Sequence, residues 1–454
     1  MIKKLLKNDV VKQFRDFGIG PIIGMFISML TVPVTTRLVL PEEFGKSSLF
    51  TLVQTIFLIV AVFGLDQAFV RYYNSKEFSK EAVLYNSFTL PLLLTIILGL
   101  VSFVFMKPIS IWLYGSYEKE LMLLFPPFLL ALLFNRYAYL ILRMELRGKL
   151  YSLLNIISQI VSFALLLTLL LFFEKTFRSI ILATIFSTII NTIIVFIITK
   201  ESWKINKKYF EKELTKKMLF FAFPLVPATL ISWLLNSFDK VALKVWSTYE
   251  ELGLYAAAFK IVALLTIFQN IFTTSWIPIA YKWYEEKKPN ELYEKISSLT
   301  SFIMTFIFAC VVFFRNVIVI FLGESYRNTT EIFMFLLFVP VMYTISEAST
   351  VGINLKKKTS YVLYATLIAT LSNLLLNYLL VPKYGAIGAA IGTCISYIMF
   401  FFTRVFLARR VWYKFSVVNL LINTFYMVGL AIFVFFGAPK IIELALLVII
   451  VITN

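Results

Sequence analysis

The stretch that decides the fold runs from Phe17 to Tyr73 and reads FGIGPIIGMFISMLTVPVTTRLVLPEEFGKSSLFTLVQTIFLIVAVFGLDQAFVRYY. It contains two apolar runs, Phe17–Leu40 and Ser47–Val70, with a proline, two glutamates and a glycine between them. Each run is long enough to cross a bilayer, because the hydrocarbon core is ~30 Å thick and a helix rises ~1.5 Å per residue. The stretch therefore predicts a membrane hairpin.

The composition extends this interpretation to the whole chain. Of the 454 residues, 60% are hydrophobic and 15% charged, and the mean hydropathy is +0.86; soluble domains are about 45–50% apolar and about 25% charged. The net charge of +18 is attributed to the positive-inside rule and not to nucleic-acid binding. The absence of His excludes His-based catalysis, and no cofactor or metal is expected.

We expect an all-α polytopic membrane protein with about 14 spans. Their approximate ranges are 17–40, 47–70, 83–106, 121–142, 152–173, 178–199, 218–238, 253–280, 297–322, 331–353, 360–381, 385–407, 417–436 and 441–453, the last being short for a full crossing. The basic N-terminal segment shows no cleavage site and is expected to be cytoplasmic. With that orientation, 29 of the 43 Lys and Arg residues fall on the inner side, as the positive-inside rule requires.

Several loop motifs recur at nearly one offset. Glu42–Gly45 matches Glu250–Gly253, Lys107 matches Arg315, and Lys175 matches Lys383, each 208 residues apart. This regularity predicts two six-helix repeats that form two lobes around a central cavity, with two additional C-terminal helices. The expected domains are 1–200, a basic cytoplasmic linker at 201–217, 218–410, and 411–454.

The chain resembles the polysaccharide transporter family within the multidrug/oligosaccharidyl-lipid/polysaccharide exporter superfamily. The segments that carry the resemblance are Pro33–Leu38, Pro41–Gly45, Gly64–Tyr73, Gly253–Tyr255 and Lys383–Ala390. The resemblance implies a flippase in a bacterial cytoplasmic (inner) membrane. Its substrate would be an undecaprenyl-diphosphate-linked oligosaccharide of the O-antigen, capsule or exopolysaccharide type, moved to the outer leaflet by alternating access. Polysaccharide assembly proteins are possible partners.

Two basic residues fall inside predicted spans, Arg136 and Lys260. A charge at the centre of a membrane helix costs roughly 2.5–3.5 kcal/mol on insertion scales, so such residues usually face a cavity or a partner. One interpretation is a snorkelled anchor near the interface. The other is a cationic cavity that holds the substrate diphosphate, for which the planar fork of Arg is suited.

Six further charged residues near span ends are candidates for gates or ion pairs. Asp66 lies near the inner end of the second span with Arg71 five residues on, and Glu347 lies near the inner end of the tenth. They are interpreted as interfacial ion pairs or as an inner gate, in which Asp66 would pair with Arg136 or with the other half. The remaining three, Arg37 and Asp239-Lys240, lie at predicted outer ends and are expected to be interfacial anchors or an outer gate.

Three other functions are weighed against the flippase. A cation-coupled multidrug exporter of the same superfamily needs buried carboxylates away from the interfaces, whereas the deepest predicted charges here are basic. A membrane-bound polymerase or ligase needs a long outer loop, which the sequence lacks. A scaffold that recruits glycosyltransferases through the seven lysines of residues 200–217 stays open.

Overall fold

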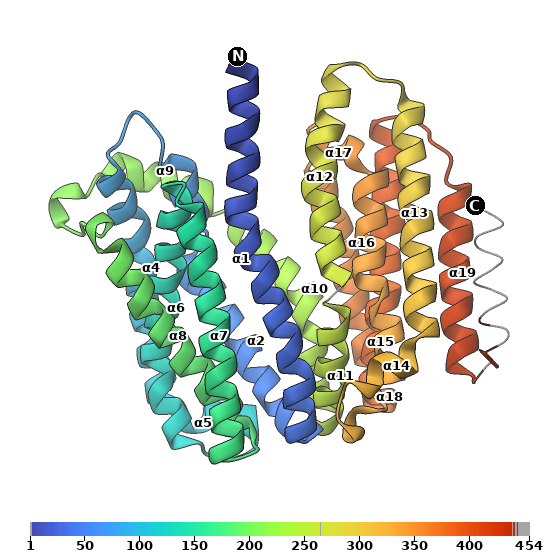
Figure 1. Ribbon diagram of the computed structural model, residues 1–454, viewed down its shortest axis with the longest axis horizontal. Coiled ribbons are helices and arrows are strands. Elements are labelled where there is room, and N and C mark those ends of the chain that lie inside the picture. Colours follow the sequence, from blue (N-terminus) through green and yellow to red (C-terminus); the bar gives the residue numbers. More distant parts are fainter. Residues whose placement is uncertain (1, 264, 438, 441–442, 444–454) are drawn as a thin grey trace. The chain divides into compact units, whose positions relative to one another are not determined.

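The computed structural model describes residues 2–263, 265–437, 439–440 and 443 (Figure 1). Within this part of the chain the regular structure is helical, and eleven helices are long and apolar enough to span a membrane. The count is twelve if a pair bent by 43°, α11 (Tyr249–Val262) and α12 (Leu265–Glu285), forms one span. The expected all-α, polytopic membrane architecture is confirmed.

The described helices form two units. The first comprises residues 1–39 and 46–230, and the second comprises residues 40–45 and 231–454. The domain boundaries expected from the sequence, including the C-terminal pair of helices, stay predictions. The predicted last span, 441–453, lies outside the described residues except for Glu443.

The first unit contains eight α-helices before the linker, some long enough to span a membrane and some short. They are α1 (Ile2–Leu38), α2 (Pro41–Val62), α3 (Leu65–Tyr72), α4 (Lys80–Val104), α5 (Met106–Tyr114), α6 (Lys119–Met144), α7 (Gly148–Phe172) and α8 (Phe177–Thr199). The helix α1 packs along α7, and α6 packs between α4 and α8. Short 3-10 turns at Lys200–Ser202 and Lys207–Tyr209 then lead to α9 (Lys212–Ala222).

The second unit begins within α10 and repeats the same order of elements. Its helices are α10 (Leu225–Trp246), α11, α12, α13 (Asn290–Phe313), α14 (Arg315–Ile320), α15 (Thr329–Leu336), α16 (Phe338–Ser349), α17 (Val351–Leu355), α18 (Ser360–Val411) and α19 (Val418–Phe435). The helix α13 packs against α16 and α19, and α16 also packs against α18.

The sequence repeat reappears in the helix boundaries. The starts of α2, α4, α5, α6 and α7 precede those of α11, α13, α14, α15 and α18 by 208–212 residues. The turns after α6 and α17 also match: the amide of Arg147 donates to Leu142 O and that of Lys358 to Ile353 O, both at 3.0 Å. The residues before these donors, Leu146 and Lys357, have nearly equal positive φ angles of 57° and 58°. Two equivalent left-handed turns therefore end equivalent helices.

The backbone takes a positive φ at two breaks between helical segments, one inside a predicted span and one between two predicted spans. The predicted span 47–70 ends early, because Phe63 and Gly64 have φ values of 49° and 72° and a new helix, α3, starts at Leu65. In α18, by contrast, one helical element covers two predicted spans, and its 52 residues would extend about 78 Å if straight. Gly385 (φ 52°, ψ −131°) breaks it, and the halves fold back together, with Asn373 donating to Thr393 at 3.3 Å. The predicted spans 360–381 and 385–407 are the two halves.

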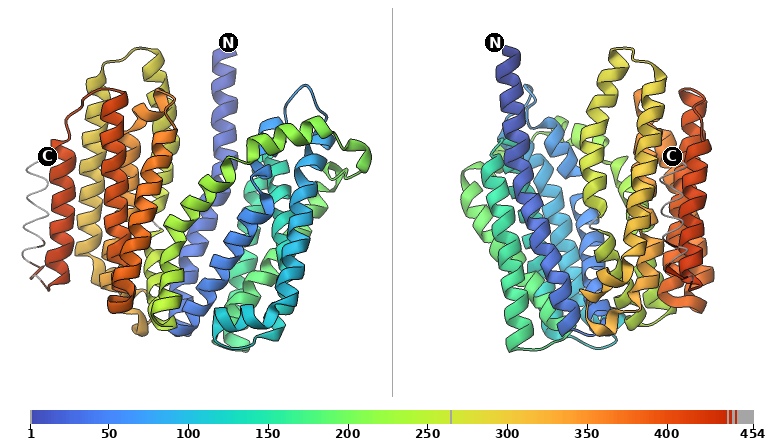
Figure 2. Two further views of the ribbon diagram at one scale, coloured as in Figure 1. Left: turned by 180° about the vertical axis from the view of Figure 1, so that it is seen from behind. Right: turned by 45° about the vertical axis from the view of Figure 1, so that its right-hand side comes forward.

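The basic linker is folded against the first unit. Asn86 on α4 donates to Tyr209 O at 2.9 Å, and its amide oxygen accepts from the Thr215 hydroxyl at 2.7 Å. Trp203 packs into an aromatic cluster with Phe88, its ring centroid 5.2 Å from that of Phe88. The linker therefore places α9 across the ends of α3 and α4, as the left view of Figure 2 shows.

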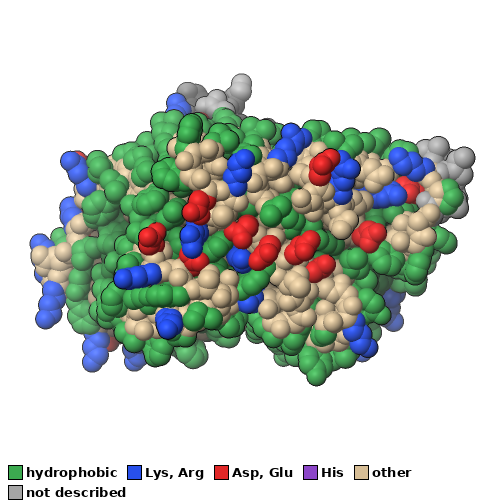
Figure 3. Space-filling model, turned by 90° about the horizontal axis from the view of Figure 1, so that it is seen from below, with side chains coloured by type: hydrophobic (Ala, Val, Ile, Leu, Met, Phe, Trp, Pro, Cys, Tyr) green, Lys and Arg blue, Asp and Glu red, His purple; other side chains and the backbone are tan. Residues whose placement is uncertain are grey.

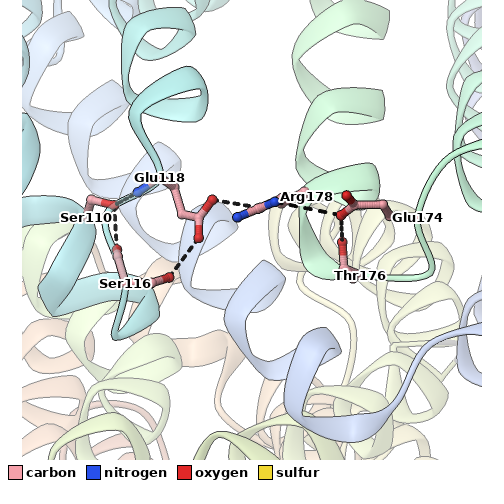
Figure 4. Close-up of polar contacts among 6 residues, drawn as sticks. All are labelled: Ser110, Ser116, Glu118, Glu174, Thr176 and Arg178. Carbon is pink, nitrogen blue, oxygen red and sulfur yellow. Dashed lines mark hydrogen bonds and ion pairs between the residues drawn. The ribbon is translucent and has the colours of Figure 1, made fainter.

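Acidic side chains are exposed in the view from below (Figure 3). The end of the first unit that carries α5 is the predicted outer side, and there the buried side chain of Glu118 joins two turns (Figure 4). Its carboxylate accepts from Arg178 Nε and from the Ser116 hydroxyl, each at 2.7 Å, and its backbone amide donates to Ser110 Oγ at 2.7 Å. The turn before α6 is thereby held to the start of α8.

This clamp predicts a pH effect on stability. Burial would raise the pKa of Glu118, but the hydrogen bonds from Arg178 and Ser116 outweigh it and leave the pKa below its usual 4.5. A lowered pKa in the folded state stabilises the protein above the usual value, and that contribution disappears as the pH falls through the lowered pKa. Thermal midpoints of wild type and Glu118→Gln should differ at neutral pH and converge in acid. A difference that persists unchanged in acid would contradict this assignment.

Two glycines allow a close crossing inside the second unit. An added Cβ on Gly253 of α11 would overlap the carbonyl oxygen of Pro41, and one on Gly45 would overlap that of Tyr249. These glycines belong to the matched motifs Glu42–Gly45 and Glu250–Gly253. The repeated motifs therefore meet each other, with backbone against backbone.

We predict that Gly253→Ala destabilises the protein by about 1–3 kcal/mol, since the overlapped atoms belong to the backbone and overpacking costs energy of this order. Gly429→Ala in α19 is the control, because its Cβ would meet nothing within 4 Å and Ala favours the helix by about 1 kcal/mol. Thermal unfolding of the purified protein in detergent measures both. Equal midpoints for the two variants would show that the crossing tolerates a side chain.

Candidate functional site

An aromatic core in the first unit positions two of the predicted site residues. The rings of Phe69 on α3, Phe88 on α4 and Tyr137 on α6 are in contact, with centroids 5.1 Å apart for Phe88–Tyr137 and 5.8 Å for Phe69–Tyr137. The Tyr137 hydroxyl donates to Ser87 O at 2.7 Å. Asp66 lies one turn before Phe69, and Arg136 immediately precedes Tyr137.

Asp66 and Arg136 form an ion pair. Arg136 Nη2 and Nε donate to Asp66 Oδ2 at 2.7 and 3.2 Å, and the amide of Gln67 donates to Oδ1 at 2.9 Å. The Asp66 side chain is only 7% exposed, whereas that of Arg136 is 43% exposed. Both hydrogen bonds from Arg136 end on one carboxylate oxygen, so the guanidinium, which has five N–H donors, keeps donors on its exposed side.

The structure pairs Asp66 with Arg136, whereas the sequence had also suggested an interfacial pair between Asp66 and Arg71. The guanidinium of Arg71 lies over the ring of Phe221 on α9, 4.4 Å from its centroid, an arrangement that attracts a cation to the negative face of the ring. Of the arrangements expected from sequence, the structure therefore contains the Asp66–Arg136 pair. Whether this pair works as a gate stays a prediction.

The largest departure from expectation is Asp239, predicted as an interfacial residue. It is 1% exposed and is surrounded by hydrogen-bond donors. Oδ1 accepts from Nδ2 of Asn373 and of Asn377 at 3.0 and 2.7 Å, and Oδ2 accepts from the Tyr255 hydroxyl at 2.6 Å. A carboxylate removed from water requires such partners, because burying it without them is very costly. This burial differs from what an exposed interfacial anchor would show, and the alternative of an outer gate stays a prediction.

The Asp239 cluster has the chemistry of a site for a small hard cation. The amide oxygens of Asn373 and Asn377 are buried, and neither has a hydrogen-bond partner among the described residues. Rotation of either amide by half a turn would exchange its nitrogen for its oxygen. The carboxylate, the two amides and the nearby Thr393 hydroxyl could then supply only oxygen ligands, which suit alkali and alkaline-earth ions. Among the described residues, no group of three His, Cys, Asp or Glu side chains is arranged to hold a metal ion.

Lys240 lies on α10 and Lys260 on α11, both within the second unit. Lys260 on α11 is exposed, and Lys240 on α10 is half-buried. None of the ion pairs found between described residues includes either lysine. Lys260 is predicted to face a cavity. Lys240, which the sequence-based interpretation had placed at an outer interface, is a second cation in the same unit.

Glu347 is buried and pairs with Arg404, whose Nη1 lies 2.7 Å from Glu347 Oε1. Arg404 on the second half of α18 is 1% exposed. The Phe400 ring lies beside the guanidinium, 5.3 Å away, and stacks on Tyr343 at 6.0 Å. Arg37, in contrast, is exposed at the end of α1, and whether it is an anchor or part of an outer gate stays a prediction.

The sequence contained a usable signal for part of what was missed. Asn373 and Asn377 lie one helical turn apart in an otherwise apolar segment, SNLLLN, and amides on one face of a membrane helix require a polar partner. Tyr255, Thr393 and Arg404 gave no such signal, because their pairing depends on how distant helices fold together.

Residues 17–283 match the family profile described as "Polysaccharide biosynthesis protein". Among curated proteins, the chain is 21% identical over 170 residues to the "Probable low-salt glycan biosynthesis flippase Agl15" of Haloferax volcanii. That alignment covers 37% of this chain and 35% of the relative, so the chain matches about a third of that protein's length.

Two solved structures share the fold. The "Lipid II flippase MurJ, inward closed conformation" has a TM-score of 0.73 at 18% identity, with 96% of each chain covered. An inward-facing "multidrug resistance MATE family transporter of the MOP superfamily" has a TM-score of 0.63 at 17% identity, covering 89% of this chain and 100% of that one. The fold expected from the resemblance is confirmed.

The buried Glu347–Arg404 pair generates a prediction about stability. Glu347→Gln should destabilise the protein by about 3–5 kcal/mol, because it leaves a buried guanidinium without a counter-charge. Glu324→Gln is the matched control, since that glutamate pairs with Arg327 on the surface, where both side chains are more than half exposed, and such pairs contribute about 0–1 kcal/mol. Thermal midpoints in detergent compare the two. If both variants behave like wild type, the Arg404 charge is compensated in another way.

Proposed function

The chain belongs to the polysaccharide biosynthesis protein family, and from this premise we propose that it is a flippase for a polyprenyl-diphosphate-linked oligosaccharide. The glycan repeat unit moves from the inner to the outer leaflet by alternating access, for the assembly of a cell-surface polysaccharide. The membrane is the bacterial cytoplasmic membrane, with the N-terminus on the cytoplasmic side. The matched relative named as a glycan flippase and the fold shared with a lipid-linked precursor flippase support this proposal.

The observation that carries the proposal is that Lys240 of α10 and Lys260 of α11 take part in none of the ion pairs found between described residues. A cation within a membrane-spanning helix is costly unless an anion or water compensates it. A diphosphate, which is multiply charged, would compensate both. Arg136 contributes in the first unit through the donors that Asp66 leaves free, and a planar guanidinium binds phosphate oxygens in pairs.

A second candidate function, cation-coupled export, is favoured by the buried Asp239 cluster. The argument against an exporter was that no carboxylate was predicted away from the interfaces. The burial of Asp239 weakens that argument. The two functions are compatible in their energetics, since a flippase driven by an ion gradient also needs a cation site. They differ in the substrate.

The enzyme alternative loses ground. None of the matched proteins described above is named as an enzyme, and the fold is that of flippases and exporters. The scaffold hypothesis depended on the seven lysines of residues 200–217, which are exposed, and it stays open. Polysaccharide assembly proteins are proposed as partners only because they would act in the same pathway.

We predict that Lys260→Ala and Arg136→Ala each lower transport about tenfold or more, since a lost charge-assisted hydrogen bond is worth about 1.5–3 kcal/mol. The measurement is the pool of finished lipid-linked oligosaccharide in a deletion strain complemented with each variant. Arg327→Ala is the control, because this arginine lies in an exposed turn and pairs with Glu324 at 3.0 Å. Accumulation of the lipid-linked unit with loss of surface glycan is expected for the two site variants, at normal protein level.

Asp239→Asn tests the cation site, and the phenotype of the deletion strain separates the two candidate functions. If Asp239 holds a coupling ion, the variant should lose the dependence of transport on the ion gradient while the protein still folds, because Asn preserves the shape of the side chain. A deletion strain with a normal lipid-linked pool and increased sensitivity to drugs would overturn the flippase proposal in favour of an exporter.

A further inference from the structure

The helix α9 has two different faces. Its Leu214, Met218 and Ala222 are fully buried against the first unit. The opposite stripe contains Lys212, Lys216 and Phe220 at four-residue spacing, which places them one above the other on a helix, and all three are exposed. Phe220 is 83% exposed. A basic amphipathic helix of this kind is typical of a membrane surface.

A hollow of about 640 Å³ lies beside this stripe, wholly within the first unit. Aromatic and apolar side chains form its wall, namely Phe63, Phe210, Leu219, Phe220, Phe223 and Pro224. Lys212 and Lys216 are its charged lining residues. Volumes of this size are usual for sites that hold small organic ligands.

The backbone beside this hollow takes an unfavourable conformation at Phe63. Phe63 has a φ of 49°, a left-handed conformation that is unfavourable for a bulky residue. The next residue, Gly64, packs on the Ala222 carbonyl, with its Cβ position 3.0 Å from that oxygen. This arrangement sets the Phe63 ring 6.5 Å from the Phe223 ring. Two helix breaks, between α2 and α3 and between α9 and α10, therefore meet to build one aromatic wall.

The lysines of the hollow differ from others of the linker. Lys217 pairs with Glu77 at 2.9 Å and Lys204 pairs with Glu81 at 3.1 Å. Among the ion pairs found between described residues, none includes Lys212 or Lys216. Like charges at this four-residue spacing destabilise a helix. An anion bound between them would relieve that repulsion.

We propose that the hollow beside α9 binds one anionic glycerophospholipid, with its phosphate at Lys212 and Lys216 and an acyl chain against Phe63, Phe220 and Phe223. The combination of a charged rim and an apolar wall matches a molecule with one anionic group and a long hydrocarbon tail. The lysines lie on the predicted cytoplasmic side, where anionic lipids attract basic segments. The site anchors α9 to the inner leaflet and does not depend on the proposed substrate.

The test is a lipid titration of the purified full-length protein in detergent, read by native mass spectrometry. The probes are phosphatidylglycerol and phosphatidylcholine with identical acyl chains. The double variant Lys212→Gln/Lys216→Gln should bind phosphatidylglycerol about 30-fold more weakly than wild type, since each basic residue near a lipid surface contributes about fivefold in affinity. Lys204→Gln/Lys217→Gln is the matched control, because it removes the same charge from the same linker and should leave the affinity unchanged.

A second variant tests the apolar wall. Phe220→Ala should weaken long-chain phosphatidylglycerol but not its short-chain analogue, and its exposure means that folding is not at risk. Equal affinity for the two headgroups, or an equal loss in the control variant, would overturn the site as a specific one. Displacement of phosphatidylglycerol by an equimolar polyprenyl diphosphate would instead assign the hollow to the transported lipid and overturn the phospholipid proposal. Failure of the flippase proposal would leave all these outcomes unaffected.

Discussion

A charge inside a hydrocarbon layer must be paired, surrounded by hydrogen-bond partners or hydrated, and this constraint organises the polar chemistry of the molecule. Arg404 is paired with Glu347 out of contact with solvent. Asp239 is surrounded by amide and hydroxyl donors. Arg136 takes an intermediate arrangement, with a buried partner and an exposed face. Lys240 and Lys260 follow neither of the first two arrangements, which is why they are the residues that most need an external anion.

Much of the fold follows from the sequence, because the bilayer leaves few choices. Backbone groups in lipid must be satisfied within the segment, so apolar runs of sufficient length become helices, and their order was predictable. The interruption at Phe63–Gly64 was not, because a single glycine between two apolar runs is compatible with a continuous helix. The hairpin at Gly385 was predictable, since 52 helical residues exceed the thickness of any bilayer.

The site was less predictable than the fold, because pairing depends on distance in space. Arg136 and Asp66 were both singled out, and their pairing was one of several options, settled by the contact between Phe69 and Tyr137. Asp239 was misjudged because its position in the sequence was taken as its depth. The helix α10 continues to Trp246, eight residues past the predicted end of that span, and this places Asp239 well inside the helix.

The two units share a scaffold but not their chemistry. With the offset of 208 residues between α2 and α11, the position equivalent to Asp239 is Thr31; with the offset of 212 between α7 and α18, Asn373 corresponds to Val161. The carboxylate–amide cluster therefore has no counterpart at these positions of the first unit, and the two units are not chemically equivalent here.

The second unit places its two kinds of site on neighbouring residues. Adjacent positions on a helix point about 100° apart, so Lys240 is directed differently from Asp239, which contacts the amides of α18. A cation bound at Asp239 would cancel the nearest negative charge and raise the positive potential at Lys240, the next residue. The electrostatic field falls off slowly in a medium of low dielectric constant, and no intervening moving part is required. An ion at Asp239 and an anion at Lys240 would then favour each other within one conformation, each to the same degree.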